Sequence, residues 1–200
     1  MPNLHLVRHG EVHNPNHVVY GDLPGFNLST RGVLQAHAAG RHLADAPVGM
    51  VITSPLARAF QTASAIASHH GLTPVRVGRL VESRQYPGWT GLRWDDVHER
   101  FADQIGRYLS DATALHDVEE SVGGIARRYS AAIDGALDET SGDLVVVGHQ
   151  DPIHATALHL VGSSLSTLRT NPPEHASVTT LDGQTDGSWE RVSYWAPPQA

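Results

Sequence analysis

A cation, an imidazole and a glycine follow the first apolar run of the chain. Residues 4–11 read Leu-His-Leu-Val-Arg-His-Gly-Glu, so Arg8 and His9 come directly after the run and Gly10 follows them. The guanidinium of Arg8 is a rigid fork of donors that suits phosphate or carboxylate. The imidazole of His9 can act as a nucleophile, a base or a metal ligand, and Gly10 allows the backbone to turn sharply beside a ligand. The tripeptide alone is a weak sign of catalysis, because it also arises by chance.

Compatible residues recur at three later points of the chain. Arg58 falls in the first turn of a helix expected after Ser54-Pro55, where free N–H groups and the helix dipole favour an anion. Glu82 follows Leu80-Val81 and can donate a proton if it is partly desolvated. His149 comes directly after another apolar run. Each has an ordinary reading on its own: a paired surface arginine, a solvated carboxylate and a structural histidine. Together with the first motif they indicate one anion site.

These residues can meet only if neighbouring strands bring their ends together. Apolar and β-branched runs predict strands, and amphipathic spacing predicts helices between them. The expected strands cover residues 3–8, 49–54, 75–80, 143–148, 177–182 and 188–195. The expected helices cover residues 30–44, 56–69, 119–138 and 152–161. This alternation predicts an α/β fold, a three-layer α/β/α sandwich with a mostly parallel, mixed, six-stranded sheet that binds ligands at its carboxyl edge.

Capping and turn residues refine this outline. Ser29 is an expected N-cap, and Ser54 with Pro55 is typical of a cap followed by a first-turn proline. The last two strands lack a helix between them and are separated by Asp-Gly pairs, which predicts an antiparallel hairpin. Residues 83–118 fit the alternation poorly and carry glycines, tryptophans and charges. We interpret them as a partly helical lid insertion within a single domain that spans residues 1–200.

The composition excludes several classes of function. The 200-residue chain has no cysteine, which excludes disulfides, thiolate catalysis and cysteine metal sites. All 14 basic residues are arginine, which removes Schiff-base chemistry and the P-loop lysine. A net charge of −7 without a basic run argues against nucleic acid as a partner. No apolar stretch is long enough to span a bilayer and no secretory signal is evident, so we expect a cytoplasmic protein without a membrane partner.

The motifs, taken in order, resemble those of the histidine phosphatase superfamily, in its phosphoglycerate mutase-like branch. The matching segments are Leu-Val-Arg-His-Gly-Glu at 6–11, Leu-Ser-x-x-Gly-x-x-Gln-Ala at 28–36, Ser-Pro-Leu-x-Arg-Ala-x-Gln-Thr-Ala at 54–63, Leu-x-Glu at 80–82 and Val-x-Gly-His at 146–149. The first and third segments are specific, and the others gain weight from the shared order. The resemblance covers roughly the first three quarters of the chain.

The resemblance implies a mechanism that agrees with the residue chemistry. His9 would attack phosphorus in line and become a phosphohistidine. Arg8, Arg58 and His149 would bind the three non-bridging oxygens, which suits a reaction that depends on positioning and charge stabilisation. Glu82 would protonate the leaving alcohol and then take a proton from water. No metal or other cofactor is implied.

Two further residues are candidate phosphate ligands, and two are alternative acids. Asn14 would contact the phosphate through its side chain, and Gln150 would lend its backbone N–H. After Glu82 the family pattern continues with a short Gly-x-Trp-Glu-Gly run, whereas this chain is longer there and lacks the second glutamate. Asp151 or Glu11 is therefore an alternative proton donor.

We accordingly predict a metal-independent phosphatase that hydrolyses a small phosphorylated metabolite. A phosphoglycerate mutase-type transferase would need more cations at the entrance to hold a bisphosphate and exclude water. Arg84, Arg93, Arg100 and Arg107 could supply them, but their spacing is equally that of a solvated face, which we favour. The remaining alternative is a phosphate-binding regulatory module with little turnover. A homodimer is compatible with the sequence, and the motifs do not select one substrate.

Overall fold

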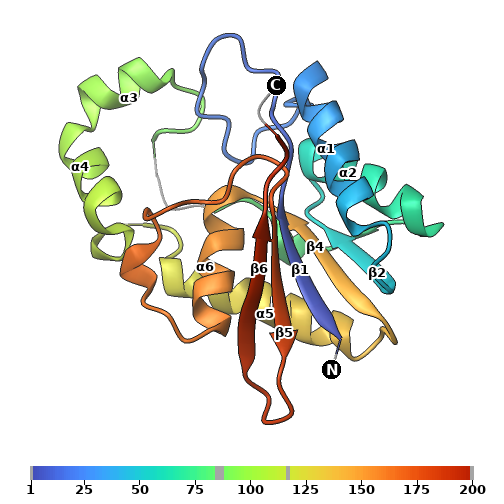
Figure 1. The fold of residues 1–200 in the computed structure, drawn as a ribbon. Coiled ribbons are helices and arrows are strands. Elements are labelled where there is room, and N and C mark those ends of the chain that lie inside the picture. The colour runs from blue at the N-terminus through green and yellow to red at the C-terminus, as the bar shows by residue number, and fades with distance from the viewer. Residues whose placement is uncertain (1, 84–87, 116–117, 199–200) are drawn as a thin grey trace.

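A mixed six-stranded sheet forms the centre of the molecule (Figure 1). The computed structural model describes residues 2–83, 88–115 and 118–198. The strands are β1 (Asn3–Arg8), β2 (Val48–Thr53), β3 (Val75–Arg76), β4 (Asp143–Gly148), β5 (Val178–Gly183) and β6 (Trp189–Trp195). Their order is β3-β2-β4-β1-β5-β6; β1 to β4 run parallel, β5 is antiparallel to β1, and β6 is antiparallel to β5. The predicted α/β fold with a mixed sheet and a terminal hairpin is confirmed.

Helices cover both faces of this sheet. The α-helices are α1 (Thr30–Leu43), α2 (Ala57–Ala67), α3 (Trp94–Arg100), α4 (Ala102–Asp111), α5 (Val122–Leu137) and α6 (Gln150–Leu160). Short 3-10 turns lie at Ser68–His70, Gly78–Leu80, Ala112–Ala114 and Leu165–Thr167. Ser29 caps α1 as predicted, since its hydroxyl accepts from the Gly32 N–H at 3.0 Å. No helix in the described ranges is long and apolar enough to cross a membrane.

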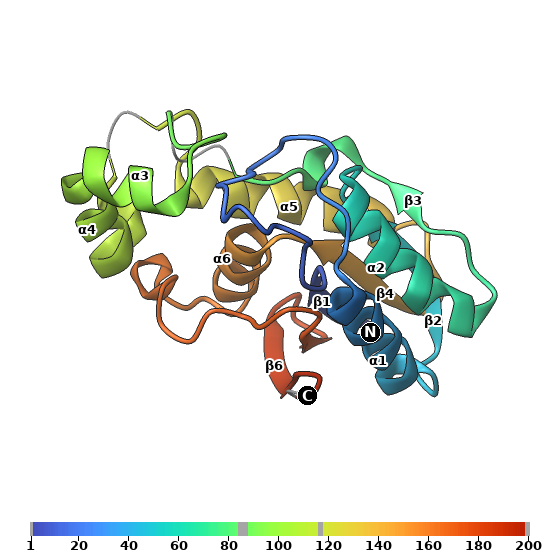
Figure 2. The same ribbon diagram turned by 90° about the horizontal axis from the view of Figure 1, so that it is seen from above.

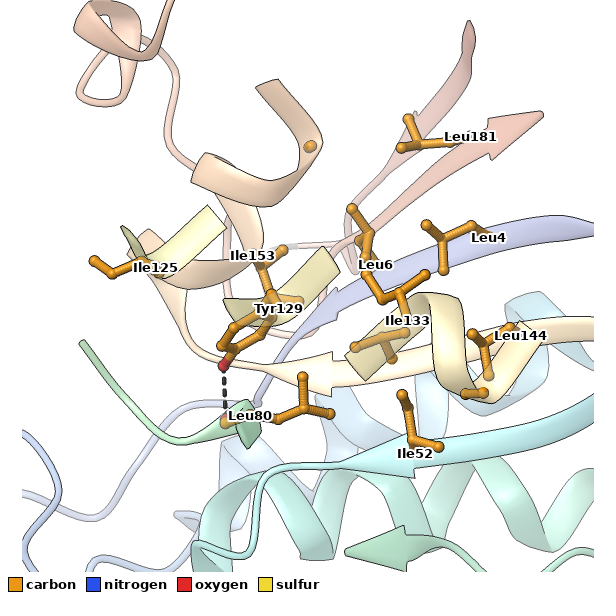
Figure 3. Close-up of a cluster of buried hydrophobic side chains, with 13 residues drawn as sticks. Leu4, Leu6, Ile52, Leu80, Ile125, Tyr129, Ile133, Leu144, Ile153 and Leu181 are labelled. Atoms are coloured by element: carbon orange, nitrogen blue, oxygen red, sulfur yellow. Dashed lines mark hydrogen bonds between the residues drawn. The ribbon is translucent and has the colours of Figure 1, made fainter. Parts of the chain in front are cut away.

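Alternating strand residues supply two separate hydrophobic layers. Leu4 and Leu6 of β1 pack with α5 and α6 (Figure 3), whereas Val7 packs with α1 and α2. β4 does the same, with Leu144 in the first layer and Val145 in the second. The central strands are therefore buried on both faces, which explains why they read as continuous apolar runs.

The parallel strands end together at one edge. Arg8 is opposite Gly148 in the β1–β4 register, and His9 N–H donates to the Gly148 carbonyl at 2.9 Å. The chain after β1 also lies against the start of α1: a Cβ at Gly10 would be 2.5 Å from the Gly32 carbonyl oxygen, so only glycine fits. The residues that follow the ends of these strands therefore lie at the same edge of the sheet.

Two local predictions are wrong. The strand expected at 75–80 pairs only over Val75–Arg76, because a 3-10 turn at Gly78–Leu80 bends the chain towards the core. Leu80 is fully buried there, and its carbonyl accepts from the Tyr129 hydroxyl at 2.6 Å (Figure 3). The second error concerns α2, whose N-cap is Leu56 and has no side-chain cap bond. The hydroxyl of Ser54 contacts His149 instead.

The predicted insertion is partly helical and has a hydrophobic cluster of its own. α3 and α4 pack around Trp89, which is fully buried, and the cluster continues through Val122 at the start of α5. Figure 2 shows α3 and α4 at one end of the molecule, with α5 and α6 between them and the α1–α2 pair. Residues 84–87 and 116–117 of the predicted lid lie outside the described residues.

Candidate active site

A pocket of about 900 Å³ opens where the strands end. Arg8, His9 and Glu82 line it, whereas Arg58 and His149 are buried, with 1% and 0% of their surfaces exposed. The rings of His9 and His149 lie 5.3 Å apart, centre to centre. Both arginines and both histidines predicted from the strand ends thus gather around one centre.

His9 presents an unprotonated nitrogen. Its Nδ1 lies 2.7 Å from the carbonyl oxygen of Gly10, which can only accept, so Nδ1 carries the proton and Nε2 carries the lone pair. Burial, with the nearby positive charges of Arg58 and Arg8, holds the pKa of His9 well below its usual value. The imidazole is therefore neutral at physiological pH, with Nε2 available as a nucleophile.

His149 is held in a tautomer that serves a different purpose. Its Nε2 lies 2.8 Å from the hydroxyl oxygen of Ser54, and that oxygen already accepts from the Leu56 N–H at 3.3 Å. The Ser54 hydroxyl hydrogen is thus free to donate to Nε2, and we assign the remaining imidazole proton to Nδ1. Nδ1 is buried without a hydrogen-bond partner among the described residues. Burial also holds the pKa of His149 well below its usual value, so a neutral ring offers an N–H donor to an anion.

Arg58 is the second residue of α2 and reaches into the centre from the sheet edge. One of its terminal nitrogens donates to the Gly21 carbonyl at 2.6 Å, and its guanidinium lies 4.6 Å from the ring centre of Tyr20. The same nitrogen is 3.8 Å from a Glu82 oxygen. Its Nε is buried and unpaired among the described residues, so a donor remains for an anion.

The approach to β5 holds Arg8 in place, a contribution that sequence reasoning missed. Arg8 donates to the Pro173 carbonyl at 2.8 Å and to His175 Nε2 at 2.7 Å. His175 lies 5.9 Å from the His9 ring, and burial beside Arg8 lowers its pKa to about 3, so it is a neutral acceptor. The antiparallel hairpin was the available signal: β5 is antiparallel to β1, so the residues before β5 must return to the edge where β1 ends.

The carboxyl of Glu82 lies close to His149 and Arg58. Its Oε2 lies 3.5 Å from His149 Nδ1 and 3.8 Å from Arg58, and its Oε1 accepts from the Ser83 N–H at 2.9 Å. Burial raises the pKa of Glu82 to about 7 against the opposing influence of Arg58. A carboxyl with this pKa is partly protonated at neutral pH and can both give and take a proton.

The family is identified by comparison along nearly the whole length. The sequence profile of the histidine phosphatase superfamily (branch 1) matches residues 4–195. The chain belongs to the histidine phosphatase superfamily. The expected resemblance is confirmed.

Relatives of this chain include named phosphatases. An uncharacterised protein of Mycobacterium tuberculosis (strain ATCC 25618 / H37Rv) is 37% identical over 191 residues, which cover 89% of this chain and 88% of its own. Phosphoserine phosphatase 1 of Hydrogenobacter thermophilus (strain DSM 6534 / IAM 12695 / TK-6) is 27% identical over 186 residues, 90% of this chain and 86% of its own. A solved structure of mycobacterial glucosyl-3-phosphoglycerate phosphatase with VO3 matches with a TM-score of 0.86 and 25% identity over 99% of this chain and 100% of that one. These similarities support phosphatase activity.

The other two carboxylates considered as proton donors have partners elsewhere. Glu11 accepts from the Ser29 hydroxyl at 2.6 Å and lies 3.6 Å from Arg31. Asp151 accepts from the Tyr108 hydroxyl at 2.9 Å and pairs with the Arg169 guanidinium at 3.0 Å. Both line the pocket, but the distances above place Glu82 against His149 and Arg58.

The two additional phosphate-ligand candidates also line the pocket. The Asn14 side chain forms two hydrogen bonds with the backbone of Val18, at 2.9 and 3.0 Å, and so fixes the loop after β1. Gln150 is the first residue of α6, and its side-chain amide lies 3.3 Å from an Asp151 oxygen. Their roles as phosphate ligands stay predictions.

Proposed function

We propose that this protein hydrolyses a small-molecule phosphate monoester through a phosphohistidine on His9, without a metal ion. The observation that carries the proposal is the fixed orientation of His9: its Nδ1–H is bound to the Gly10 carbonyl, so Nε2 remains for attack. Arg8, Arg58 and His149 each keep a buried nitrogen without a hydrogen-bond partner among the described residues, and these donors can bind a phosphoryl group at His9.

The proposed reaction has two steps that share one acid–base group. His9 Nε2 forms a bond to phosphorus while the bond to the leaving oxygen breaks, and protonated Glu82 gives its proton to that oxygen. The Glu82 carboxylate then takes a proton from water, whose oxygen attacks phosphorus and breaks the P–N bond. Inorganic phosphate leaves, and both His9 and Glu82 return to their starting states.

The arginines and His149 supply the positive charge and donors that a metal would otherwise provide, which supports a metal-independent reaction. A phosphoglycerate mutase-type transfer, or a module that binds phosphate without useful turnover, is the alternative. Four other expectations also stay predictions. They are a small metabolite as partner, no nucleic acid or membrane partner, a homodimer and a cytoplasmic location.

The test is hydrolysis of p-nitrophenyl phosphate with and without excess chelator, with wild type, H9A and the control H37A. His37 is exposed on α1 and does not line the pocket. We expect chelator-resistant hydrolysis and an acid-labile phosphoenzyme in wild type and H37A, and neither in H9A. Hydrolysis that disappears with chelator, or that survives in H9A, would contradict the proposal. Transfer of phosphate between positions of 3-phosphoglycerate would favour the mutase instead.

A further inference from the structure

The segment that carries Glu82 has left the sheet before it reaches the reactive centre. β3 pairs with β2 only over Val75–Arg76, and one further hydrogen bond runs from the Val77 N–H to the Thr53 carbonyl at 2.9 Å. The chain then forms the turn at Gly78–Leu80 and arrives at the acidic residue two positions later. A carboxyl on such a segment depends on contacts with another element to keep its place.

Two consecutive residues of α5 bind the backbone of this segment. One terminal nitrogen of Arg128 donates to the Arg79 carbonyl and, at 3.1 Å, to the Val81 carbonyl. The Tyr129 hydroxyl donates to the Leu80 carbonyl at 2.6 Å (Figure 3). The three successive carbonyls that precede the acidic residue therefore all accept hydrogen bonds from α5.

Arg128 is itself fixed by a carboxylate. Its Nε and its other terminal nitrogen donate to the two oxygens of Glu120 at 2.6 and 2.7 Å. The two side chains are only 19% and 20% exposed, so solvent and salt screen this pair less than a pair on the open surface. A planar guanidinium bound in this bidentate way has a fixed orientation, and its third nitrogen is thereby held against the backbone carbonyls.

The Tyr129 hydroxyl lies between the backbones that carry two groups of the reactive centre. Tyr129 is fully buried, and a Cβ at Gly148 would be 2.8 Å from its hydroxyl oxygen. Burial raises the pKa of Tyr129 well above its usual value, so the hydroxyl stays protonated and donates. The hydroxyl thus contacts the segment before Glu82 and lies against the end of β4, directly before His149.

We propose that Arg128 and Tyr129 are positioning residues of the reaction, because they hold the backbone from which the carboxyl of Glu82 reaches the reactive centre. This inference rests on the proposed phosphatase activity, in which Glu82 gives and takes the proton. That carboxyl lies 3.5 Å from His149 Nδ1 and 3.8 Å from Arg58, and these are the distances that the two residues maintain. A misplacement of about 1 Å at a reacting group can slow a reaction about 10²-fold.

The experiment compares kcat/KM for glycerol 1-phosphate with kcat/KM for p-nitrophenyl phosphate in wild type, Y129F and R128K. Y129F removes only the hydroxyl, and R128K keeps the charge but offers one nitrogen where Arg128 uses three. We expect each variant to lower the first value about 10- to 100-fold and the second less than about threefold, because p-nitrophenolate leaves without a proton. R127K is the matched control, since Arg127 is exposed on α5 and does not line the pocket, and it should behave like wild type.

A double-variant cycle separates positioning from a purely structural role. If Tyr129 acts through Glu82, adding Y129F to E82Q should change kcat/KM for glycerol 1-phosphate by less than about twofold. A structural role would instead slow both substrates alike and would slow E82Q further. Either of these outcomes, or variants that behave like R127K, would overturn the inference.

The pH profile provides a second readout. Burial raises the pKa of Glu82 to about 7, so a loosened segment that admits water should lower that pKa. The ratio of the two kcat/KM values should therefore reach half its maximum at a lower pH in Y129F than in wild type, and a half-maximum at the same or a higher pH would overturn the inference. The other titratable and charged groups around this carboxyl are unchanged in Y129F, and they are Arg8, Tyr20, Arg58, Arg128, His149 and Asp151.

Hydrolysis of p-nitrophenyl phosphate through His9 separates this inference from the proposed function. If that hydrolysis persists while Y129F and R128K leave glycerol 1-phosphate unaffected, the phosphatase proposal stands without the positioning role. If wild type hydrolyses neither ester, both proposals fall. The two variants alter the segment from different residues, so a variant whose urea midpoint shows that it is folded decides the question if the other is unfolded.

Discussion

Raising the pH should slow the hydrolysis of alkyl phosphates before it affects aryl phosphates. The reason is Glu82, whose pKa burial raises to about 7. An alkoxide needs a proton to leave, whereas p-nitrophenolate leaves without one. The acid form of Glu82 therefore limits the first class of substrate and is largely irrelevant to the second.

The size of the effect follows from the pKa. At pH 7 about half of the molecules carry a protonated Glu82, whereas a carboxyl at the ordinary value of 4.5 would be protonated in about 0.3% of them. The buried site thus supplies roughly 150 times more acid at neutral pH. Above about pH 8 the protonated fraction falls tenfold for each pH unit. Removing the acid altogether, in E82Q, should slow alkyl phosphates about 10²- to 10⁴-fold.

The assay is the ratio of kcat/KM for glycerol 1-phosphate to that for p-nitrophenyl phosphate, from about pH 5.5 to 9.5. The ratio cancels the ionisation of the nucleophile, which both substrates share, and each kcat/KM is first corrected for the dianion fraction of its own phosphate. We expect it to be level in acid, to reach half its maximum near pH 7 and to fall steeply above that. In E82Q the ratio should be low and independent of pH.

E11Q is the matched control, because Glu11 is also a lining carboxylate but is bonded to Ser29. Its ratio should follow that of wild type. A ratio that does not change with pH, equal slowing of both substrates in E82Q, or a collapse of the ratio in E11Q would refute the assignment of Glu82 as the acid.

Three further outcomes follow from the same geometry. S54A removes the donor to His149 Nε2; ¹⁵N spectra should show the His149 proton leaving Nδ1, and kcat/KM should fall about 10- to 100-fold, whereas an unchanged tautomer would contradict our assignment. R58A should lower kcat for p-nitrophenyl phosphate by about 10²- to 10³-fold, or ~3–4 kcal/mol, with little change in the urea midpoint. The buried histidines of the site have lowered pKa values, so below about pH 6.5 the unfolded chain takes up protons that the native state does not. The free energy of unfolding should therefore fall as the pH is lowered. Glu82 opposes this trend between about pH 4.5 and 7, because its raised pKa lets the native state bind the extra proton. H175N keeps an acceptor but cannot titrate, so the free energy of unfolding in urea should fall less between pH 7 and 5 than in wild type, by up to about 2 kcal/mol.

The sequence was sufficient to predict the parallel part of the sheet and the residues at its edge. Buried parallel strands need apolar side chains on both faces, so β1 and β4 were visible as uninterrupted runs. Arg8, His9 and His149 stand where those runs stop, and their convergence follows from strand direction alone.

The remaining parts depended on tertiary contacts. The strand predicted through Leu80 ended early, because burial of that side chain against Tyr129 favours a turn over further pairing at the sheet edge. Ser54 is a residue type typical of a helix N-cap, but its hydroxyl contacts His149, which lies 95 positions later in the sequence. His175 follows two prolines and has no apolar run before it, so only the direction of β5 pointed to it.

The close approach of Gly10 to α1 has a consequence for how this enzyme can vary. A Cβ at Gly32 would lie 2.0 Å from the carbonyl oxygen of Glu11, so even a single methyl group on the helix would displace the loop that carries His9. Gly32 does not line the pocket. Close packing of the α1 backbone against the backbone of this loop therefore keeps the attacking nitrogen of His9 in position. A substitution at Gly32, outside the pocket lining, could thus inactivate the protein.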